Sequence, residues 1–253
     1  MRGAALRWLS RRLQRHGYEI DAIGEVSGSA LRRRLFSQLA ELGFDPVHVV
    51  DVGAHRAGWS RDAHEYFGGA AFTLIEPQAE LGPQLEHFCA NAGRARYLLA
   101  GAGASDGELE LTVTPDNPES SSFAISGATA DRLGLERRSV RLVTLDTVCR
   151  ESEWPTPRMI KIDAEGFELE VLAGARSLLG VVELFFLELP LSQTSEAERG
   201  ARPDFHTIVA HMHDQGYEPY DVTDLIRRPS DRALGLAEVA FARRGGKLMT
   251  AGW

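Results

Sequence analysis

Cysteine is scarce in this sequence of 253 residues, which contains only Cys89 and Cys149. Two cysteines are too few for a disulfide framework, and they fit a reducing compartment. No apolar run approaches the roughly 20 residues that are needed to span a bilayer. Residues 1–17 contain several arginines but no apolar centre of a signal peptide. We therefore expect a cytoplasmic protein without a transmembrane segment.

Positive charge is also in short supply. The formal net charge is −8 and the sequence pI is about 5.5. This balance disfavours a nucleic-acid partner, because contacts to phosphates require clustered lysine and arginine. The apolar fraction of 43% and the charged fraction of 25% are ordinary for a globular protein. The length is sufficient for one large α/β domain, and we expect a single domain that binds no nucleic acid.

A β-branched apolar run that ends in an acid and a glycine organises the chain. Residues 48–52 predict a buried parallel strand, and Gly53 begins the turn toward a helix at about residues 59–67. A second apolar run, residues 71–75, stops at Glu76. Ligands of open α/β sheets bind beyond the carboxyl ends of the strands. Glycine lets the backbone approach a ligand, and the acid is placed to accept hydrogen bonds from two ribose hydroxyls. The pattern predicts an adenosine-bearing cofactor.

The glycine pattern of a dinucleotide site is missing from this turn. That site requires G-x-G-x-x-G, but only Gly53 and Gly58 are present, and Ala54 occupies the place of the second glycine. Asp51 puts a carboxylate at the same loop, where it would repel a pyrophosphate but suit the ammonium and sulfonium groups of S-adenosylmethionine. These residues favour S-adenosylmethionine. An oxidoreductase linked to NAD or to a nucleotide sugar is the alternative enzyme class.

Acids at later strand ends indicate a second part of the site. The predicted strand at residues 159–163 ends in Asp163, and Glu165 lies in the turn that follows. A carboxylate at a strand tip can take a proton from a hydroxyl group or hold a divalent metal. Asp163 is the first candidate for the catalytic base, Glu165 is the second and His55 is the third. The charge of Glu165 at a helix N-terminus is a structural alternative. No metal is expected, but Asp163, Glu165 and Glu188 are the candidate ligands if one binds.

The third predicted strand, residues 96–100, leads into a less regular region. Ser105 and Asp106 follow it and would lie near the adenine edge if the strand ends at the cofactor. Residues 108–114 alternate like a half-buried strand and predict a hairpin. The polar stretch at residues 114–134 predicts a lid or substrate wall over the cofactor, with a surface excursion as the alternative.

The N-terminal part differs in composition from the remainder. Residues 5–16 predict a short basic amphipathic helix, which either caps the domain or contacts a membrane surface or a partner. A second helix is predicted at residues 30–42. We expect an N-terminal helical extension, residues 1–42, followed by one α/β domain, residues 43–253.

Several stretches of the sequence together resemble the FkbM family of S-adenosylmethionine-dependent methyltransferases. They are residues 50–54, 75–77, the serine-rich loop around 120–122, 144–146 and, most specifically, 161–175. The similarity covers roughly residues 49–242. It implies a class I methyltransferase fold, a Rossmann-like α/β sheet of seven strands with helices on both faces, in which six strands are parallel and one near the C-terminus is antiparallel. It also implies O-methylation of a hydroxyl group on a sugar, glycoconjugate or polyketide-type natural product.

The resemblance also implies roles for individual residues. By position, the cofactor site would contain Asp51, Gly53 and Glu76, with Ala54, Ser105 and Asp106 beside them, and the acceptor side would contain Asp163 and Glu165. His55 stands where the family usually has asparagine, and Ala57 where it usually has glycine. The expected partner is a small-molecule or glycan acceptor. A non-catalytic protein that scaffolds a biosynthetic complex through its N-terminal helices is the alternative outside the enzymes.

Overall fold

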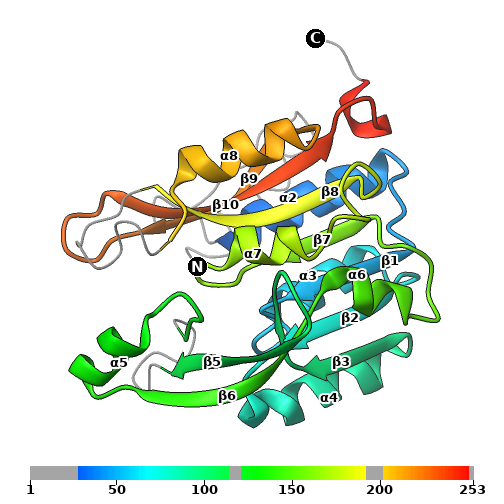
Figure 1. Ribbon diagram of the computed structural model, residues 1–253. Helices are drawn as coiled ribbons and strands as arrows, with labels where there is room; N and C mark the ends of the chain where they lie inside the picture. Colours follow the sequence, from blue (N-terminus) through cyan, green and yellow to red (C-terminus); the bar gives the residue numbers. More distant parts are fainter. Residues whose placement is uncertain (1–27, 114–120, 192–201, 251–253) are drawn as a thin grey trace, which may run out of the picture.

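Figure 1 shows a computed structural model of the chain, which describes residues 28–113, 121–191 and 202–250. The segment predicted as a basic helix, residues 5–16, lies outside the described residues. Seven strands form the main sheet in the order β3-β2-β1-β7-β8-β10-β9. Their bounds are β1 His48–Val52, β2 Ala71–Glu76, β3 Ala95–Leu99, β7 Met159–Ile162, β8 Leu184–Pro190, β9 Tyr217–Arg227 and β10 Leu234–Arg243.

The strand directions confirm the predicted fold class. β3, β2, β1, β7 and β8 pair in parallel, and β10 pairs antiparallel with both β8 and β9. Six strands of this sheet therefore run in one direction and β10 runs in the other. The strand order reverses at β1, which lies between β2 and β7. A crevice at such a reversal is where open α/β sheets bind their ligands.

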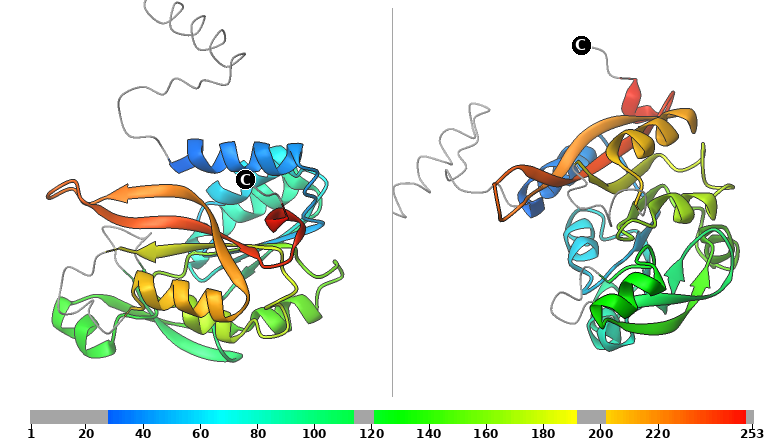
Figure 2. Two further views of the ribbon diagram at one scale, coloured as in Figure 1. Left: turned by 90° about the horizontal axis from the view of Figure 1, so that it is seen from above. Right: turned by 60° about the vertical axis from the view of Figure 1, so that its left-hand side comes forward.

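Helices cover both faces of the main sheet, as Figures 1 and 2 show. Side chains of α2, α3 and α4 pack in one hydrophobic cluster against one face, and side chains of α6, α7 and α8 pack in a second cluster against the other. Because both faces are covered, every residue of β1 and β2 is buried, which explains their continuous apolar runs. The bounds are α2 Gly28–Glu41, α3 Gly58–Tyr66, η1 Ala79–Leu81, α4 Gly82–Ala92, α6 Leu145–Arg150, α7 Glu168–Ala173, α8 Phe205–Asp214 and η3 Lys247–Met249.

The helix predicted at residues 30–42 corresponds to α2 and is part of the domain core. Its Leu35, Phe36 and Leu39 are at most 1% exposed. The ring of Phe36 lies edge-on to those of Trp59 and Phe186, with centroids 5.3 and 5.7 Å apart. α2 therefore shares its hydrophobic core with the domain that the sequence places at residues 43–253. None of the helices in the described ranges combines the length and the apolar composition needed to cross a bilayer.

A second, three-stranded sheet is inserted between β3 and β7. It contains β4 Gly101–Ala102, β5 Gly107–Val113 and β6 Glu136–Val143, in the order β4-β6-β5, and α5 Gly127–Leu133 precedes β6. β5 pairs antiparallel with β6. The hairpin predicted at residues 108–114 is therefore wrong in its partner, because this strand pairs with a later segment and not with the strand before it.

Candidate active site

A cavity of about 590 Å³ opens at the carboxyl ends of the central strands. This volume lies within the range of small-molecule sites, roughly 300–1,000 Å³. Two separated parts of the sequence form its walls. From the first part come Val52, Gly53, Ala54, His55, Arg56, Ile75, Glu76 and Gln78, and from the second part come Lys161, Asp163, Ala164, Glu165 and Glu188. The cavity therefore lies where the sequence predicts the cofactor.

Gly53 is required by a close approach between β1 and the turn after β7. Its φ of +69° lies in the left-handed region, and a Cβ built on it would come within 1.9 Å of the carbonyl oxygen of Asp163. The N–H groups of Gly53 and Ala54 both donate to the carbonyl of Ile75. A glycine is therefore needed where two strand ends and the cavity meet. His55 and Ala57 also have positive φ, 46° and 56°, and such strain in non-glycine residues is concentrated at functional sites.

Glu76 lines the cavity and is held by backbone donors. One carboxylate oxygen accepts from the N–H of His55 at 2.8 Å, and the other accepts from the N–H of Gln78 at 2.9 Å. The residue is 2% exposed, and burial raises the pKa of Glu76 although these two N–H groups oppose the rise. Each carboxylate oxygen can accept more than one hydrogen bond. The carboxylate is thus fixed in place with acceptor capacity left for a ligand hydroxyl.

Asp51 lies below the cavity and does not line it. It is fully buried, accepts a hydrogen bond from the Ser60 hydroxyl at 2.6 Å, and lies 3.4 Å from Nζ of Lys161. The sequence places this carboxylate against the cofactor, but the strand register pairs Asp51 with Lys161 on β7. The structure therefore assigns Asp51 to a buried ion pair that supports the loop.

Lys161 connects the two parts of the site. It is not among the site residues that the sequence predicts. Its Nζ donates to the carbonyl of Gly53 at 2.9 Å and lies 3.1 Å from Oδ2 of Asp163. Burial alone would lower the pKa of Lys161, but the carboxylates of Asp163 and Asp51 outweigh burial and raise it above the ordinary value. The lysine is therefore a permanent positive charge beneath the cavity. In the sequence, the feature that marks Lys161 is its position as a single charged residue in the otherwise apolar strand β7.

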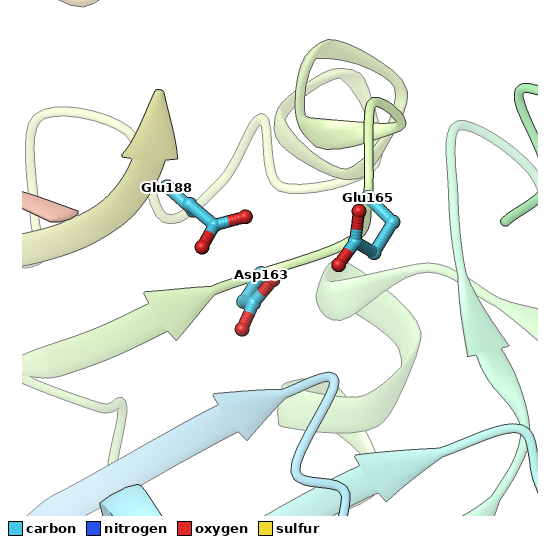
Figure 3. A group of neighbouring side chains, drawn as sticks. All are labelled: Asp163, Glu165 and Glu188. Carbon is cyan, nitrogen blue, oxygen red and sulfur yellow. The ribbon is translucent and has the colours of Figure 1, made fainter. Parts of the chain in front are cut away.

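Asp163, Glu165 and Glu188 converge on one place, as Figure 3 shows. Each offers a carboxylate oxygen, and these three atoms lie within 4.8 Å of one another. Asp163 follows β7 directly, Glu165 is in the turn before α7, and Glu188 lies near the end of β8. The predicted meeting of acids from different strand ends is present in the structure.

The surroundings of these carboxylates shift their protonation. Burial raises the pKa of Glu165 to about 7, and the nearby Asp163 charge adds to the rise while Arg202 opposes it. Arg202 lies 3.2 Å from Glu165. Burial, with the charges of Asp163 and Glu165, raises the pKa of Glu188 well above its ordinary value. Glu165 is therefore able to take up a proton near neutral pH.

Glu168 organises the acidic turn from below. This residue is 2% exposed, and one of its carboxylate oxygens accepts from the N–H groups of Ala164 at 3.2 Å and Gly166 at 2.9 Å. Glu165, between them, has a φ of 51°, again in the left-handed region. The turn is thus held in a strained shape that presents Glu165 to the cavity. The sequence also permits a structural role for its charge at the helix N-terminus, but this role alone would not require the side chain to line the cavity.

A divalent metal would have to compete with cations that the chain already supplies. Nζ of Lys161 and the guanidinium of Arg202 each lie within 3.2 Å of one of the three carboxylates, on Asp163 and Glu165 respectively. These ion pairs are consistent with the expectation of chemistry without a metal, and we propose no metal-dependent step.

Ser105 and Asp106 do not line the cavity, and the role predicted for them is replaced by another. Both are exposed. The Asp106 carboxylate accepts from the N–H of Thr144 at 2.6 Å and from the hydroxyl of Thr147 at 2.8 Å, at the start of α6. After β3 the chain enters the second sheet, which carries these residues away from the adenosine end. Asp106 therefore holds the start of α6, whose N-cap is Thr144.

The loop that follows residue 120 forms part of the cavity wall. Ser121 and Phe123 line the cavity, and the hydroxyl of Ser122 donates to the carbonyl of Glu165 at 2.6 Å. Phe123 lies so close to Gly101 that a Cβ there would come within 2.4 Å of its ring. Two residues of the stretch at 114–134 thus contribute to the cavity wall, and its role as a lid or substrate wall stays a prediction. Residues 114–120 lie outside the described residues.

Residues distant in sequence complete the walls of the cavity, and they are not among the site residues that the sequence predicts. Arg32 of α2, Asp224 of β9 and Glu238 of β10 all line the cavity. Arg32 donates to Asp62 at 2.7 Å and lies 3.7 Å from Glu238. Glu238 stands out in the sequence as an acid within an otherwise apolar strand, but no local pattern marks Arg32 or Asp224.

Three features occur together here: a sheet with one antiparallel strand, a glycine turn after β1, and a buried acid at the end of β2. Together they define a class I methyltransferase. The chain belongs to the FkbM family of S-adenosylmethionine-dependent methyltransferases, because the model of the methyltransferase FkbM domain matches residues 51–219. The family named from sequence motifs is thereby confirmed. No curated protein matches the chain significantly.

Solved structures of several other methyltransferases have low similarity to this chain. A 1,6-didemethyltoxoflavin-N1-methyltransferase from Burkholderia thailandensis is 14% identical, with a TM-score of 0.45 over 85% of this chain and 79% of that one. A precorrin-6y C5,15-methyltransferase from Geobacter metallireducens is 12% identical, with a TM-score of 0.43 over 83% and 87% of the two chains. At this level of similarity, neither structure bears on the acceptor of this chain.

Proposed function

We propose that this protein transfers the methyl group of S-adenosylmethionine to a hydroxyl oxygen of a sugar, glycoconjugate or polyketide-type natural product. The observation that carries the proposal is one cavity with two differently built ends. One end has a buried carboxylate held by backbone N–H groups, at Glu76. The other has three carboxylates within 4.8 Å of one another, at Asp163, Glu165 and Glu188. The first suits a ribose, and the second suits proton removal from an alcohol.

The residues at the first end fit the cofactor. Glu76 is buried and has acceptor capacity for ribose hydroxyls, and Gly53 lets the turn after β1 pack against the backbone of Asp163 at the edge of the cavity. Ala54 and His55 complete the turn beside them. Bound S-adenosylmethionine supplies an electrophilic methyl group on a positively charged sulfur. These residues would hold its adenosine part, so that its charged part extends toward the acids.

The residues at the second end supply the proton acceptor. An alcohol is a weak nucleophile at neutral pH, so a base within hydrogen-bond reach is needed. In the overall reaction a C–O bond forms and a C–S bond breaks, sulfur keeps the electron pair, and the hydroxyl proton passes to a carboxylate. We propose Asp163 as this base, oriented by Lys161, with Glu165 beside it. Alignment of donor and acceptor supplies much of the remaining rate.

His55 is the weaker candidate for the base. Its backbone N–H donates to Glu76, which puts the residue at the end of the cavity that we assign to the ribose. We therefore place His55 in the cofactor loop. The oxidoreductase alternative loses its support, because the family match is to a methyltransferase. A scaffold role for the N-terminal segment is compatible with an active enzyme and stays a prediction.

Calorimetric titration with S-adenosylhomocysteine, with NAD as control ligand, tests the cofactor assignment. We expect micromolar binding of adenosylhomocysteine and no binding of NAD. Transfer of labelled methyl groups from S-adenosylmethionine to a panel of hydroxylated sugars and polyketides then tests the acceptor class. Binding of NAD alone would contradict the proposal, and labelling confined to amines or thiols would overturn O-methylation.

A further inference from the structure

Carboxylates are distributed unequally around the cavity. Four neighbouring strands, β7, β8, β10 and β9, each contribute one at or just past the strand: Asp163, Glu188, Glu238 and Asp224. We name these four side chains the acidic wall. On the other side, between β1 and β3, Glu76 is the acid among mostly uncharged lining residues, which include Ile75, Ala100, Gly101 and Ala102. A bound molecule thus meets negative charge mainly on one side.

The register of the sheet builds the acidic wall. Glu238 on β10 is paired with Glu188 on β8 and with Asp224 on β9. Residues directly opposite each other on antiparallel strands project from the same face. Asp163 extends β7 by one residue, beside the pair of Ile162 and Leu187. Backbone pairing therefore fixes the positions on neighbouring strands from which these side chains extend.

The acidic wall contains four carboxylates, and two cations lie within 4 Å of them, Lys161 beside Asp163 and Arg32 beside Glu238. Asp163 is paired with Lys161, and Glu238 has the Thr223 hydroxyl at 2.6 Å and Arg32 at 3.7 Å. Glu188 has no hydrogen bond or ion pair with any residue in the described part of the chain. Its charged neighbours are the carboxylates of Asp163, Glu165 and Glu168, with Lys161 as the opposing cation. A positive charge on a ligand would complete this arrangement.

We propose that the acidic wall, and Glu188 in particular, makes the enzyme select S-adenosylmethionine over S-adenosylhomocysteine by the charge on sulfur. This inference rests on the proposed function, because it requires the ribose at Glu76 and the charged part of the cofactor toward β7 and β8. The two molecules differ by one methyl group and one positive charge. Transfer of the methyl group removes that charge, so the acidic wall loses its partner and the product is released more easily.

The preference depends on the ionisation of Glu188. Burial and the neighbouring acids raise the pKa of Glu188, which favours its protonated form in the free enzyme. A cationic ligand favours the ionised form, and its binding then releases a proton. The selectivity is therefore fully present above the raised pKa and declines as the pH falls through it. Adenosylhomocysteine, which is neutral at sulfur, has no such dependence.

Calorimetry with three ligands tests the inference and does not require the acceptor. The ligands are S-adenosylmethionine, S-adenosylhomocysteine and sinefungin, which has an amino group on carbon in place of the methylated sulfur. We expect both cationic ligands to bind at least tenfold more tightly than adenosylhomocysteine, which corresponds to about 1.4 kcal/mol. In Glu188→Gln the difference should fall below about threefold, with the affinity for adenosylhomocysteine unchanged.

Glu86→Gln is the matched control, because Glu86 is exposed on α4 and its substitution changes the net charge by the same amount. This variant should keep the full selectivity. Equal affinities for the three ligands in the wild type, or a Glu188→Gln variant that keeps the tenfold preference, would overturn the inference and leave the proposed function intact. If none of the three ligands binds, the proposed function fails, and the inference fails with it.

Discussion

The two ends of the cavity use carboxylates in opposite ways. At the end of β2, Glu76 is surrounded by backbone N–H groups, which hold its geometry and favour its charge. At the ends of β7 and β8, the carboxylates of Asp163, Glu165 and Glu188 face one another. Backbone donors make a fixed acceptor for hydroxyl groups, whereas mutually repelling acids make a site that takes up a proton or a cation.

Lys161 links the two ends of the cavity and offsets part of the negative charge that is buried there. It lies between Asp51 of the first half and Asp163 of the second, and it also bonds the carbonyl of Gly53. The ammonium thus neutralises a fully buried acid on one side and positions the proposed base on the other. Substitution of this bridging lysine should therefore affect both halves of the site, whereas substitutions at either end should affect one half.

Lys161→Met should have the largest effect, because it breaks the bridge. It leaves the fully buried Asp51 without its cation, which costs about 3–5 kcal/mol of unfolding free energy. For a domain of this size, this corresponds to a Tm lower by roughly 6–20 °C in thermal denaturation. The control is Lys247→Met at the other lysine, which is exposed. An unchanged Tm for the Lys161 variant would contradict the bridging role.

Asp163→Asn should disable the second half alone. It removes the proposed base, so methyl transfer should fall by about 10²–10⁴-fold. Because the first half is untouched, binding of adenosylhomocysteine should change by less than about threefold. Single-turnover assays and calorimetry measure the two effects separately, with Asp214→Asn on the exposed end of α8 as control. A normal rate of transfer would show that Asp163 is not the base.

Glu76→Ala should disable the first half and weaken all cofactor ligands alike. Hydrogen bonds to a charged group contribute about 1.5–3 kcal/mol, so we expect affinities lower by about 10- to 100-fold for S-adenosylmethionine and adenosylhomocysteine together. This uniform loss distinguishes Glu76 from Glu188, whose substitution should affect only the cationic ligands. Retained affinity in titration calorimetry would exclude the proposed ribose contact.

Asp106→Ala should have the smallest effect and leave both halves unchanged. Loss of its hydrogen bonds to Thr144 and Thr147 costs about 1 kcal/mol, or roughly 2–4 °C in Tm. The affinity for adenosylhomocysteine should stay within about twofold of the wild type. A tenfold loss of that affinity would instead restore the adenine contact that the sequence predicts for Asp106.

The sequence predicts the strand ends well, since an apolar run that stops at a glycine or an acid marks both the strand and its tip. Gly53, Glu76 and Asp163 were found in this way, and parallel pairing brings their strand ends to one edge. The motif around residues 161–175 added the family. These features are local, so one sequence is sufficient to recognise them.

Features that depend on pairing between distant segments were not predictable in the same way. The sequence predicts that Asp51 contacts the cofactor. Its actual partner, Lys161 on β7, depends on the strand order, which no local pattern gives. Ser105 and Asp106 were misplaced because β4 and β6 pair with each other and form a second sheet. The contributions of Arg32 and Asp224 depend on how α2 and the last hairpin pack, which no local pattern encodes.

A crystal structure of the complex with S-adenosylhomocysteine tests the central claim most directly, because the claim assigns the two ends of the cavity. The account predicts ribose hydroxyls in hydrogen-bond contact with Glu76, adenine toward Ala100–Ala102, and sulfur on the side of Asp163 and Glu188. Adenosine placed against the acidic wall, or a ligand bound outside this cavity, would contradict it.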